Sequence, residues 1–305
     1  MSHAPAPSPF VWRSLLFVPA TSERFTSSAI KQKADALQID LEDSVGPDQK
    51  QLARDLVPEL ADRYEAAGFD VVIRVNRPWR LLVRDIEACV RQSVKALTLP
   101  KVPDGSFIRS VAEVLADVET EAGLPVGHTR LIAMVEDAEG LDNINDIAQA
   151  HPRVCAMIVG AEDLAHNLHM AVDADTLYVP NVMTVAACRR AGITPLGFVG
   201  SVADFADRDA FRKTVERGAR LGFQGAFCVH PSQVDIANTA YTPPAEAAER
   251  ARRLLEEFDK QCAAGKAACT FEGRMVDAPV AAQARQVLER YDRIQAMQAR
   301  RQNAG

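Results

Sequence analysis

The sequence lacks the features that mark several classes of protein. Its six cysteines are scattered and form no C-x-x-C pair, so neither a zinc cluster nor a disulfide framework is predicted. No apolar run has the length that spans a bilayer. The opening MSHAPAPSPF has neither the basic nor the apolar region of a secretory signal. Acidic residues outnumber basic ones, 41 to 35, which argues against a diffuse nucleic-acid-binding surface. We therefore expect a cytoplasmic protein that binds neither nucleic acid nor membrane.

The composition that is present is that of an ordinary globular protein. Of the 305 residues, 48% are hydrophobic and 25% are charged, and these values exclude wholesale disorder. At roughly 150 residues per domain, the length suits two domains or one large α/β barrel. Residues 1–12 are rich in proline, alanine and serine and are predicted to form a disordered tail.

After this tail, short apolar runs alternate with longer segments of helical period. Eight runs are apolar nearly throughout, as is typical of strands buried on both faces of a parallel sheet: 14–19, 36–41, 70–76, 96–100, 129–135, 154–160, 194–199 and 225–230. Eight strand–helix units within residues 13–242 predict an α/β fold, a (β/α)8 TIM barrel that forms the catalytic domain. The alternative is an open doubly wound sheet. It would carry a Gly-rich phosphate loop after the first strand, where this chain has Pro19-Ala20-Thr21-Ser22-Glu23.

Residues 243–305 depart from this repeat. The sequence predicts a charged helix over 243–262, a short hairpin over 265–277 and a long polar helix over 278–302. We interpret this segment as a C-terminal helix–hairpin–helix lid and oligomerisation arm.

Charged residues follow the predicted strands at the end where a TIM barrel holds its active site. They are Asp40, Glu42, Asp43, Arg74, Lys101, Glu136, Asp137, Glu162, Asp163 and His230. Several carboxylates in one mouth repel each other unless a cation lies between them. Because the ligands on offer are oxygen atoms, a hard divalent cation is favoured.

Some of these residues have a structural interpretation as well. A single Asp after a strand is commonly the N-cap of the next helix, and we favour that role for Asp137 and Asp146, and on the pattern alone for Asp43. His230 is either a structural hydrogen-bonding residue or a catalytic base. The cysteines at 155, 188 and 228 have apolar neighbours and are predicted to be core residues rather than nucleophiles.

Short motifs along the chain resemble the citrate lyase β-subunit-like proteins of the HpcH/HpaI aldolase superfamily. The motifs are RSLLFVP (13–19), DLEDSV (40–45), VIRVN (72–76), LPKV (99–102), MVEDAEG (134–140), VGAEDL (159–164), VHPSQ (229–233) and EGRMVD (272–277). They run in order and at fitting spacing over about residues 12–290. Within that superfamily, the last motif is similar to the lid of malyl-CoA and citramalyl-CoA lyases.

The resemblance implies roles for individual residues. Glu136 and Asp163 match the family's metal ligands, for Mg²⁺ or alternatively Mn²⁺. Arg74 matches the arginine that meets the thioester or carboxylate oxygen of the substrate. Glu42 and Asp43 would shape the water shell of the metal from outside.

The resemblance also implies a second set of contacts. Asp277 matches a lid aspartate that completes the site of a neighbouring subunit, which implies a homo-oligomer such as a trimer. Phe17, Arg24 and Lys31 lie where relatives contact the CoA moiety.

The chain departs from the family pattern at the active-site mouth. It has Pro180-Asn181 where many relatives have an Arg-Ser pair. It has Gly197-Phe198-Val199-Gly200 where many have Asp-Gly, and Glu136-Asp137 where Glu-Thr is common. These changes bear on the acyl group of the substrate more than on the fold or the metal.

The function that the resemblance implies is carbon–carbon cleavage, or formation, of a 3-hydroxyacyl-CoA thioester such as citramalyl-CoA or malyl-CoA. The partners are then a CoA thioester and a short keto acid. Alternatives are a malyl-CoA thioesterase, a citrate lyase β subunit acting on an acyl-carrier thioester, and a non-catalytic barrel that serves as a binding subunit.

Overall fold

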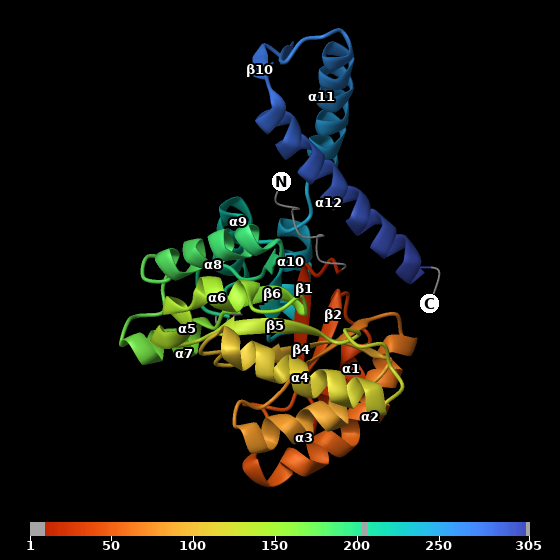
Figure 1. The fold of residues 1–305 in the computed structure, drawn as a ribbon, viewed down its shortest axis with the longest axis vertical. Coiled ribbons are helices and arrows are strands. Elements are labelled where there is room, and N and C mark those ends of the chain that lie inside the picture. The colour runs from red at the N-terminus through yellow and green to blue at the C-terminus, as the bar shows by residue number, and fades with distance from the viewer. Residues whose placement is uncertain (1–9, 203–205, 303–305) are drawn as a thin grey trace. The chain divides into compact units, whose positions relative to one another are not determined.

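The computed structural model describes residues 10–202 and 206–302, and the chain divides into two compact units, residues 1–241 and 242–305. Figure 1 shows the chain from the red N-terminal strands to the blue C-terminal helix. Among the described residues, no helix combines the length and the apolar character that crossing a membrane needs.

The first unit is built on one sheet of eight parallel strands. They are β1 (Ser14–Pro19), β2 (Ala36–Asp40), β3 (Asp70–Arg74), β4 (Val94–Leu99), β5 (Arg130–Val135), β6 (Val154–Val159), β7 (Thr194–Pro195) and β8 (Ala226–Cys228). Their order in the sheet is β7-β6-β5-β4-β3-β2-β1-β8. A parallel bridge between Leu196 and Gly225 joins the two edge strands, so the sheet closes on itself. This is the α/β barrel that the sequence predicts, and the doubly wound alternative is wrong.

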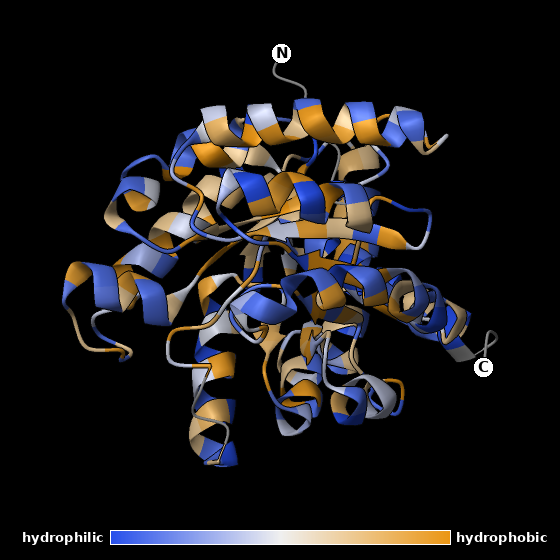
Figure 2. Ribbon diagram, turned by 90° about the horizontal axis from the view of Figure 1, so that it is seen from below, coloured by the Kyte–Doolittle hydropathy of each residue, from blue (hydrophilic) through white to orange (hydrophobic). Residues whose placement is uncertain are grey.

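Helices follow the strands and lie outside the sheet (Figure 1). They are α1 (Glu23–Ala29), α2 (Lys50–Ala66) with the 3-10 turn η1 (Pro47–Gln49) before it, α3 (Trp79–Cys89), α4 (Gly105–Glu121), α5 (Ala138–Asp142), α6 (Ile144–Gln149), α7 (Ala161–Leu168), α8 (Tyr178–Ala191), α9 (Arg208–Leu221) and α10 (Pro231–Ala240). Helical ribbons in Figure 2 carry both hydrophilic and hydrophobic residues, as expected of helices that cover a core on one side only.

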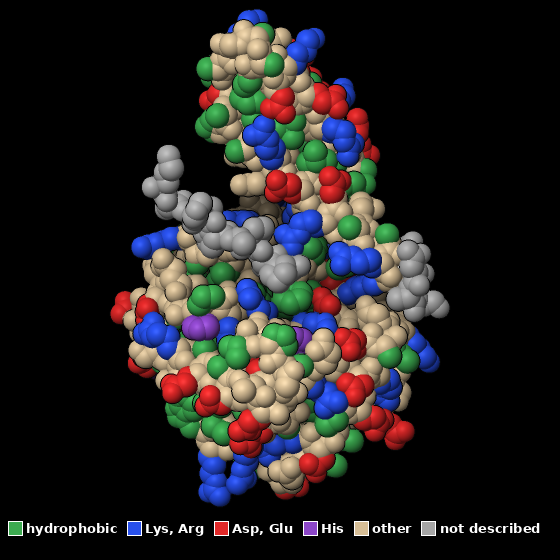
Figure 3. Space-filling view, turned by 45° about the vertical axis from the view of Figure 1, so that its right-hand side comes forward, with side chains coloured by type: hydrophobic (Ala, Val, Ile, Leu, Met, Phe, Trp, Pro, Cys, Tyr) green, Lys and Arg blue, Asp and Glu red, His purple; other side chains and the backbone are tan. Residues whose placement is uncertain are grey.

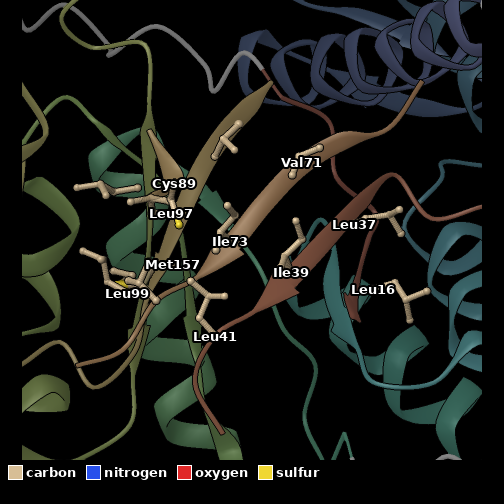
Figure 4. Packing of buried hydrophobic residues seen from close by; sticks show 14 of the residues in the cluster. Leu16, Leu37, Ile39, Leu41, Val71, Ile73, Cys89, Leu97, Leu99 and Met157 are labelled. Atoms are coloured by element: carbon tan, nitrogen blue, oxygen red, sulfur yellow. The ribbon is translucent and has the colours of Figure 1, made fainter. Parts of the chain in front are cut away.

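Alternation along the strands divides the buried residues into two layers. Leu37, Ile39 and Ile73 point outward, toward the helices, and pack in the large cluster of Figure 4. Val72 and Met134 belong to a second cluster inside the barrel. Because side chains in a strand alternate with period two, each strand supplies both layers, which explains why the strand sequences are apolar nearly throughout.

The predicted strands agree closely with the observed ones, and the seventh differs most. The sequence predicts a strand over 194–199, whereas β7 ends at Pro195. Gly197 has a φ of 135°, a backbone conformation that L-residues with side chains rarely adopt, and it turns the chain out of the strand.

The amino-terminal end of the barrel is closed by aromatic residues. Trp12 is buried, and its indole Nε1 donates a 2.7 Å hydrogen bond to Asp70. Phe10 stacks on the Trp12 ring with a centroid distance of 4.5 Å. Residues 1–9 of the predicted tail lie outside the described residues.

The second unit is a helical pair with a hairpin. Helix α11 (Ala245–Ala263) is followed by β9 (Cys269–Phe271), β10 (Arg274–Val276) and α12 (Ala278–Gln302). The two strands pair antiparallel, and Val276 packs with Leu254 and Phe258 of α11. The elements match the predicted helix, hairpin and helix.

Basic and acidic side chains are interspersed over the face of the molecule drawn in Figure 3. The near balance of the two kinds agrees with the modest formal charge of −6 for the whole chain.

One buried ion pair fixes the loop that leads into β5. Glu119 of α4 accepts hydrogen bonds from Nη1 and Nη2 of Arg153 at 2.7 and 2.6 Å, and both side chains are almost fully buried. It also accepts from the backbone amides of Gly127 and Thr129, each at 2.7 Å. These bonds hold the pKa of Glu119 below its ordinary value, although burial alone would raise it.

Replacing Glu119 should therefore cost much more stability than replacing an exposed neighbour. We expect Glu119→Gln to lower the free energy of unfolding by about 3 kcal/mol, because it leaves the Arg153 charge buried without its partner. Glu121→Gln, two residues along on an exposed position, serves as the control. Urea unfolding of both variants is the measurement, and equal midpoints for the two would contradict this account.

Candidate active site

A cavity of about 500 Å³ opens at the carboxyl-terminal ends of the barrel strands. Its lining includes Phe17, Asp40, Asp43, Arg74, Met134, Glu136, Gly160, Asp163, Gly197, Phe198 and Phe227. The volume lies in the range of small-molecule sites, and the position is the one at which TIM barrels carry their active sites.

Strand alternation explains why charged residues reach this cavity. Arg74 is two residues beyond Val72, and Glu136 is two beyond Met134, so both side chains continue the inward-facing rows of β3 and β5. Asp40 closes β2 and is the register partner of Arg74 on the neighbouring strand. Their side chains therefore meet inside the mouth of the barrel.

Arg74 donates hydrogen bonds to two acidic residues. Its Nε and Nη2 donate to the two carboxylate oxygens of Asp40 at 2.7 and 2.8 Å, and its Nη1 donates to Asp43 at 3.1 Å. The guanidinium carbon lies 4.7 Å from the centroid of the Phe17 ring. A guanidinium has five N–H donors, so this network leaves Arg74 with donors to spare at the cavity.

Arg74 also sets the charge state of Asp40. Burial alone would raise the pKa of the Asp40 carboxyl, but the hydrogen bonds and the charge of Arg74 hold that pKa below its ordinary value. The same acidic partners raise the pKa of Arg74 despite its burial. This pair is thus a fixed ion pair in the wall of the cavity.

Glu42 is a buried carboxylate between two cations. Its Oε1 accepts from Nζ of Lys101 at 3.1 Å, and its Oε2 lies 3.0 Å from Nη1 of Arg74 without a hydrogen bond among the described residues. Burial raises the pKa of Glu42, and the charge of Arg74 opposes that rise. Asp43, the next residue, is mostly exposed.

Glu136 is the most perturbed acid of the cavity. It is 4% exposed, and its Oε2 accepts the backbone N–H of Lys101 at 2.7 Å. Burial raises its pKa to about 7, and the negative charges of Glu42 and Asp163 add to the rise. Gly160 is packed against this carboxylate, and a Cβ atom there would overlap Oε1 of Glu136.

Lys101 links the acids of three strands, and the sequence analysis did not assign it a role. Its Nζ lies 3.1 Å from Glu42 and 2.9 Å from Oδ2 of Asp163, and its backbone N–H binds Glu136. It has a φ of 49°, which a non-glycine residue adopts rarely. Arg77 supports this turn by donating from Nε to the Lys101 carbonyl at 3.0 Å. Asp40 was predicted to lie at this end of the strands but without a role, although it is two residues beyond the buried Gln38 on the same strand.

The donor set fits a divalent cation of the Mg²⁺ kind. Glu136 and Asp163 offer only carboxylate oxygens, and a positive charge beside Glu136 would relieve the strain that its raised pKa reports. Among the described residues, no cluster of three or more His, Cys, Asp or Glu side chains is arranged to hold a metal ion. A site with two protein carboxylates is typical of Mg²⁺, which keeps several water or substrate ligands.

Four of the sequence-predicted site residues do not line this cavity. One of them, Glu42, contacts Arg74 and Lys101 instead. Arg24 lies on α1 and Lys31 just after it, and both side chains are exposed. Asp277 lies in the second unit, where its carboxylate caps α12 by accepting the backbone N–H of Val280 at 3.2 Å.

Other residues after the strands have structural roles, as the alternative interpretation held. Asp137 caps α5 by accepting the Gly140 amide at 2.8 Å. The N-cap role predicted for Asp146 is wrong, because Asp146 lies inside α6 and accepts the amide of Gly105, the first residue of α4, at 2.8 Å. His230 caps α10 in a capping box with Gln233. Asp43 differs, because its carboxylate binds Arg74 at the cavity.

The sequence is similar to a protein family and to several characterised proteins. Residues 13–231 match the HpcH/HpaI aldolase/citrate lyase family. The chain is 31% identical to the citrate lyase subunit beta of Escherichia coli K12 over 283 residues, which cover 91% of this chain and 92% of that protein. It is 30% identical to the L-malyl-CoA/beta-methylmalyl-CoA lyase of Rhodobacter capsulatus over 288 residues, which cover 87% and 90% of the two chains.

A solved structure is similar over most of the chain. It is that of CitE from Mycobacterium tuberculosis in complex with magnesium, acetoacetate and coenzyme A. The TM-score is 0.70 at 28% sequence identity, and the match covers 92% of this chain and 97% of that one.

The raised pKa of Glu136 predicts a pH-dependent cost in stability. The unfolded carboxyl ionises near 4.5 and the folded one near 7, so the folded state binds more protons between these values. The free energy of unfolding therefore falls as the pH rises from 4.5 to 7 and stays low above that. Glu136→Gln, which keeps an acceptor for the Lys101 amide, should stabilise the EDTA-treated protein at pH 8 by up to about 3 kcal/mol.

Urea unfolding at pH 5 and pH 8, both in EDTA, measures this effect. The exposed Glu139→Gln is the matched control, because it removes the same charge three residues away. Wild-type protein that is as stable at pH 8 as the Glu136→Gln variant would show that Glu136 carries no such strain.

Proposed function

The chain belongs to the HpcH/HpaI aldolase/citrate lyase family, a family of lyases, and on that basis we propose that it is a Mg²⁺-dependent carbon–carbon lyase. The proposed reaction cleaves a 3-hydroxyacyl-CoA thioester such as citramalyl-CoA or malyl-CoA to acetyl-CoA and a 2-keto acid, or runs in reverse. The observation that carries the proposal is the pairing of the strained Glu136 with the fixed Arg74 in one cavity.

Glu136 and Asp163 are the proposed metal ligands. When bound, Mg²⁺ supplies positive charge opposite the carboxylate and hydroxyl groups of the substrate, where negative charge grows as the carbon–carbon bond breaks. Lys101 contributes by orienting both acids, since its amide holds one oxygen of Glu136 and its ammonium holds one oxygen of Asp163. In each case the second carboxylate oxygen is left for the cation.

Arg74 is proposed to face the thioester end of the substrate. The substrate hydroxyl first gives up its proton to solvent, and its oxygen becomes the carbonyl oxygen of the keto acid as the bond between the hydroxyl-bearing carbon and the thioester α-carbon breaks. The electron pair of that bond passes to the α-carbon and onto the thioester oxygen as an enolate. A guanidinium fixed by Asp40 and Asp43 meets that oxygen without reorganising, so its stabilisation is larger in the transition state than in the ground state. Glu42 and Asp43 complete the electrostatic frame around Arg74, as the family resemblance implies.

The enolate carbon then needs a proton to become acetyl-CoA. We propose that Asp277 supplies it, acting from the lid of a neighbouring subunit in a closed ring such as a trimer. In condensation the same carboxylate would remove the proton. Phe17, Arg24 and Lys31 remain the proposed contacts to CoA; Phe17 lines the cavity, and the two basic residues are exposed on and after α1.

Product analysis tests the reaction. Incubation with Mg²⁺ and malyl-CoA or citramalyl-CoA should yield acetyl-CoA with glyoxylate or pyruvate, and excess EDTA or Asp163→Asn should abolish turnover. Chromatography of the CoA species and the keto acids is the measurement. Glu162→Gln, at the residue before Asp163, is the control that removes a charge outside the proposed ligand pair.

Other products would identify the other candidates. Free CoA with intact malate means a thioesterase. Turnover confined to a citryl thioester on a carrier protein means a citrate lyase β subunit. No turnover of any thioester, with Mg²⁺ present and the protein folded, would leave the non-catalytic barrel.

Subunit mixing tests the role of Asp277. We expect co-expressed Asp277→Asn and Glu136→Ala chains, each inactive alone, to recover about a quarter of wild-type activity, since one site in four then combines an intact barrel with an intact neighbouring lid. Asn is used because it preserves the N-cap of α12. Co-expression of Glu136→Ala with Asp163→Ala is the control, because both changes disable the barrel. No recovery after two-tag purification of mixed oligomers would restrict Asp277 to its own barrel or to capping.

A further inference from the structure

A second cavity, of about 490 Å³, lies at the opposite end of the barrel strands. Arg130, the first residue of β5, lines it together with His151, which precedes β6, and Arg190, near the end of α8. Glu136 at the candidate active site is six residues further along the same strand direction, so the two cavities are about 20 Å apart. The second cavity is therefore distinct from the first.

The polar lining of this cavity is positive. Its charged or ionisable lining residues besides Cys155 are Arg130, His151 and Arg190, and no Asp or Glu is among the lining residues. Nε of Arg130 is buried and has no hydrogen-bond partner among the described residues. Nδ1 of His151 accepts the Arg153 amide at 3.1 Å, so the neutral ring carries its proton on Nε2 as a donor.

Glu119, the acid that binds Arg153 two residues after His151, is already paired. Glu119 binds Arg153 through both oxygens, as described above. Burial lowers the pKa of His151, and the charges of Arg153 and Arg130 lower it further. Like charges and an unpaired buried donor are costly without a partner of opposite sign.

We propose that this cavity binds a small organic anion through its carboxylate or phosphate group. The guanidinium groups of Arg130 and Arg190 and Nε2–H of His151 contact the anionic oxygens, an arrangement that suits planar, multidentate recognition. Ala148, Val154 and Ile193 line the remaining wall and receive the uncharged part of the ligand. The volume is that of a small-molecule site rather than of a single ion.

Titration calorimetry with three probes tests the site: inorganic phosphate, glycerol 3-phosphate and propionate. We expect at least one probe to bind the wild-type protein, with an affinity that falls as salt rises. Arg130→Gln and Arg190→Gln should each weaken that binding at least tenfold, because each removes a charged hydrogen-bond donor. The exposed Arg84→Gln, on α3, removes the same charge elsewhere and should change nothing.

One further variant locates the bound probe, and Arg190→Gln guards against a folding defect. Arg74→Gln alters the candidate active site, so a probe whose binding depends on Arg74 and not on Arg130 would overturn the proposal. Binding that is equal in wild-type and Arg130→Gln protein, or no binding of any probe, would overturn it as well. Arg190 is exposed, so Arg190→Gln keeps the test available if Arg130→Gln fails to fold. This test is independent of the lyase reaction.

Discussion

The mouth of this barrel depends on the ion pair between Asp40 and Arg74. The two residues are register partners at the ends of neighbouring strands, so the parallel sheet itself brings them together. Once paired with Asp40, the guanidinium binds Asp43 and lies against Glu42, which fixes the chain after β2. An unpaired carboxylate at the buried position of Asp40 would cost several kcal/mol, so this pair is a condition for placing further acids nearby.

The sequence pattern predicted the strands of the barrel better than the roles of the residues in the candidate site. Apolar runs located all eight strands, because a strand covered on both faces must be apolar throughout, although the seventh run extends four residues beyond β7. Arg74 and Glu136 were found because they end such runs. Lys101 was located in the same way, but its role was not predicted. That role depends on a left-handed backbone conformation that directs its amide to Glu136 and its ammonium to Asp163. No composition signal encodes that conformation, since lysine has no preference for it.

Residue type alone also does not distinguish an aspartate that lines the cavity from one that caps a helix. Asp137 and Asp163 both follow buried strands, yet the first accepts a helix amide and the second lines the cavity. The difference lies in where each residue falls relative to the first helical turn: Asp137 precedes α5, whereas Asp163 is already inside α7. A residue at the N-cap directs its side chain toward the free amides of the helix, whereas Asp163, the third residue of α7, directs its side chain to the cavity.

The cavities at the two ends of the barrel have opposite excess charge. At the carboxyl-terminal end, acids outnumber cations, and burial raises the pKa of Glu136 to about 7, so its ionised form costs stability until a cation lies beside it. At the amino-terminal end, Glu119 is already paired with Arg153, and Arg130 is left with a buried donor that no described residue satisfies. A fold selected for stability alone would pair these groups with one another, as it does for Glu119 and Arg153. One cavity has an excess of negative charge and the other an excess of positive charge, and each is large enough for a small molecule. Such unpaired charge is expected where a ligand of opposite charge binds.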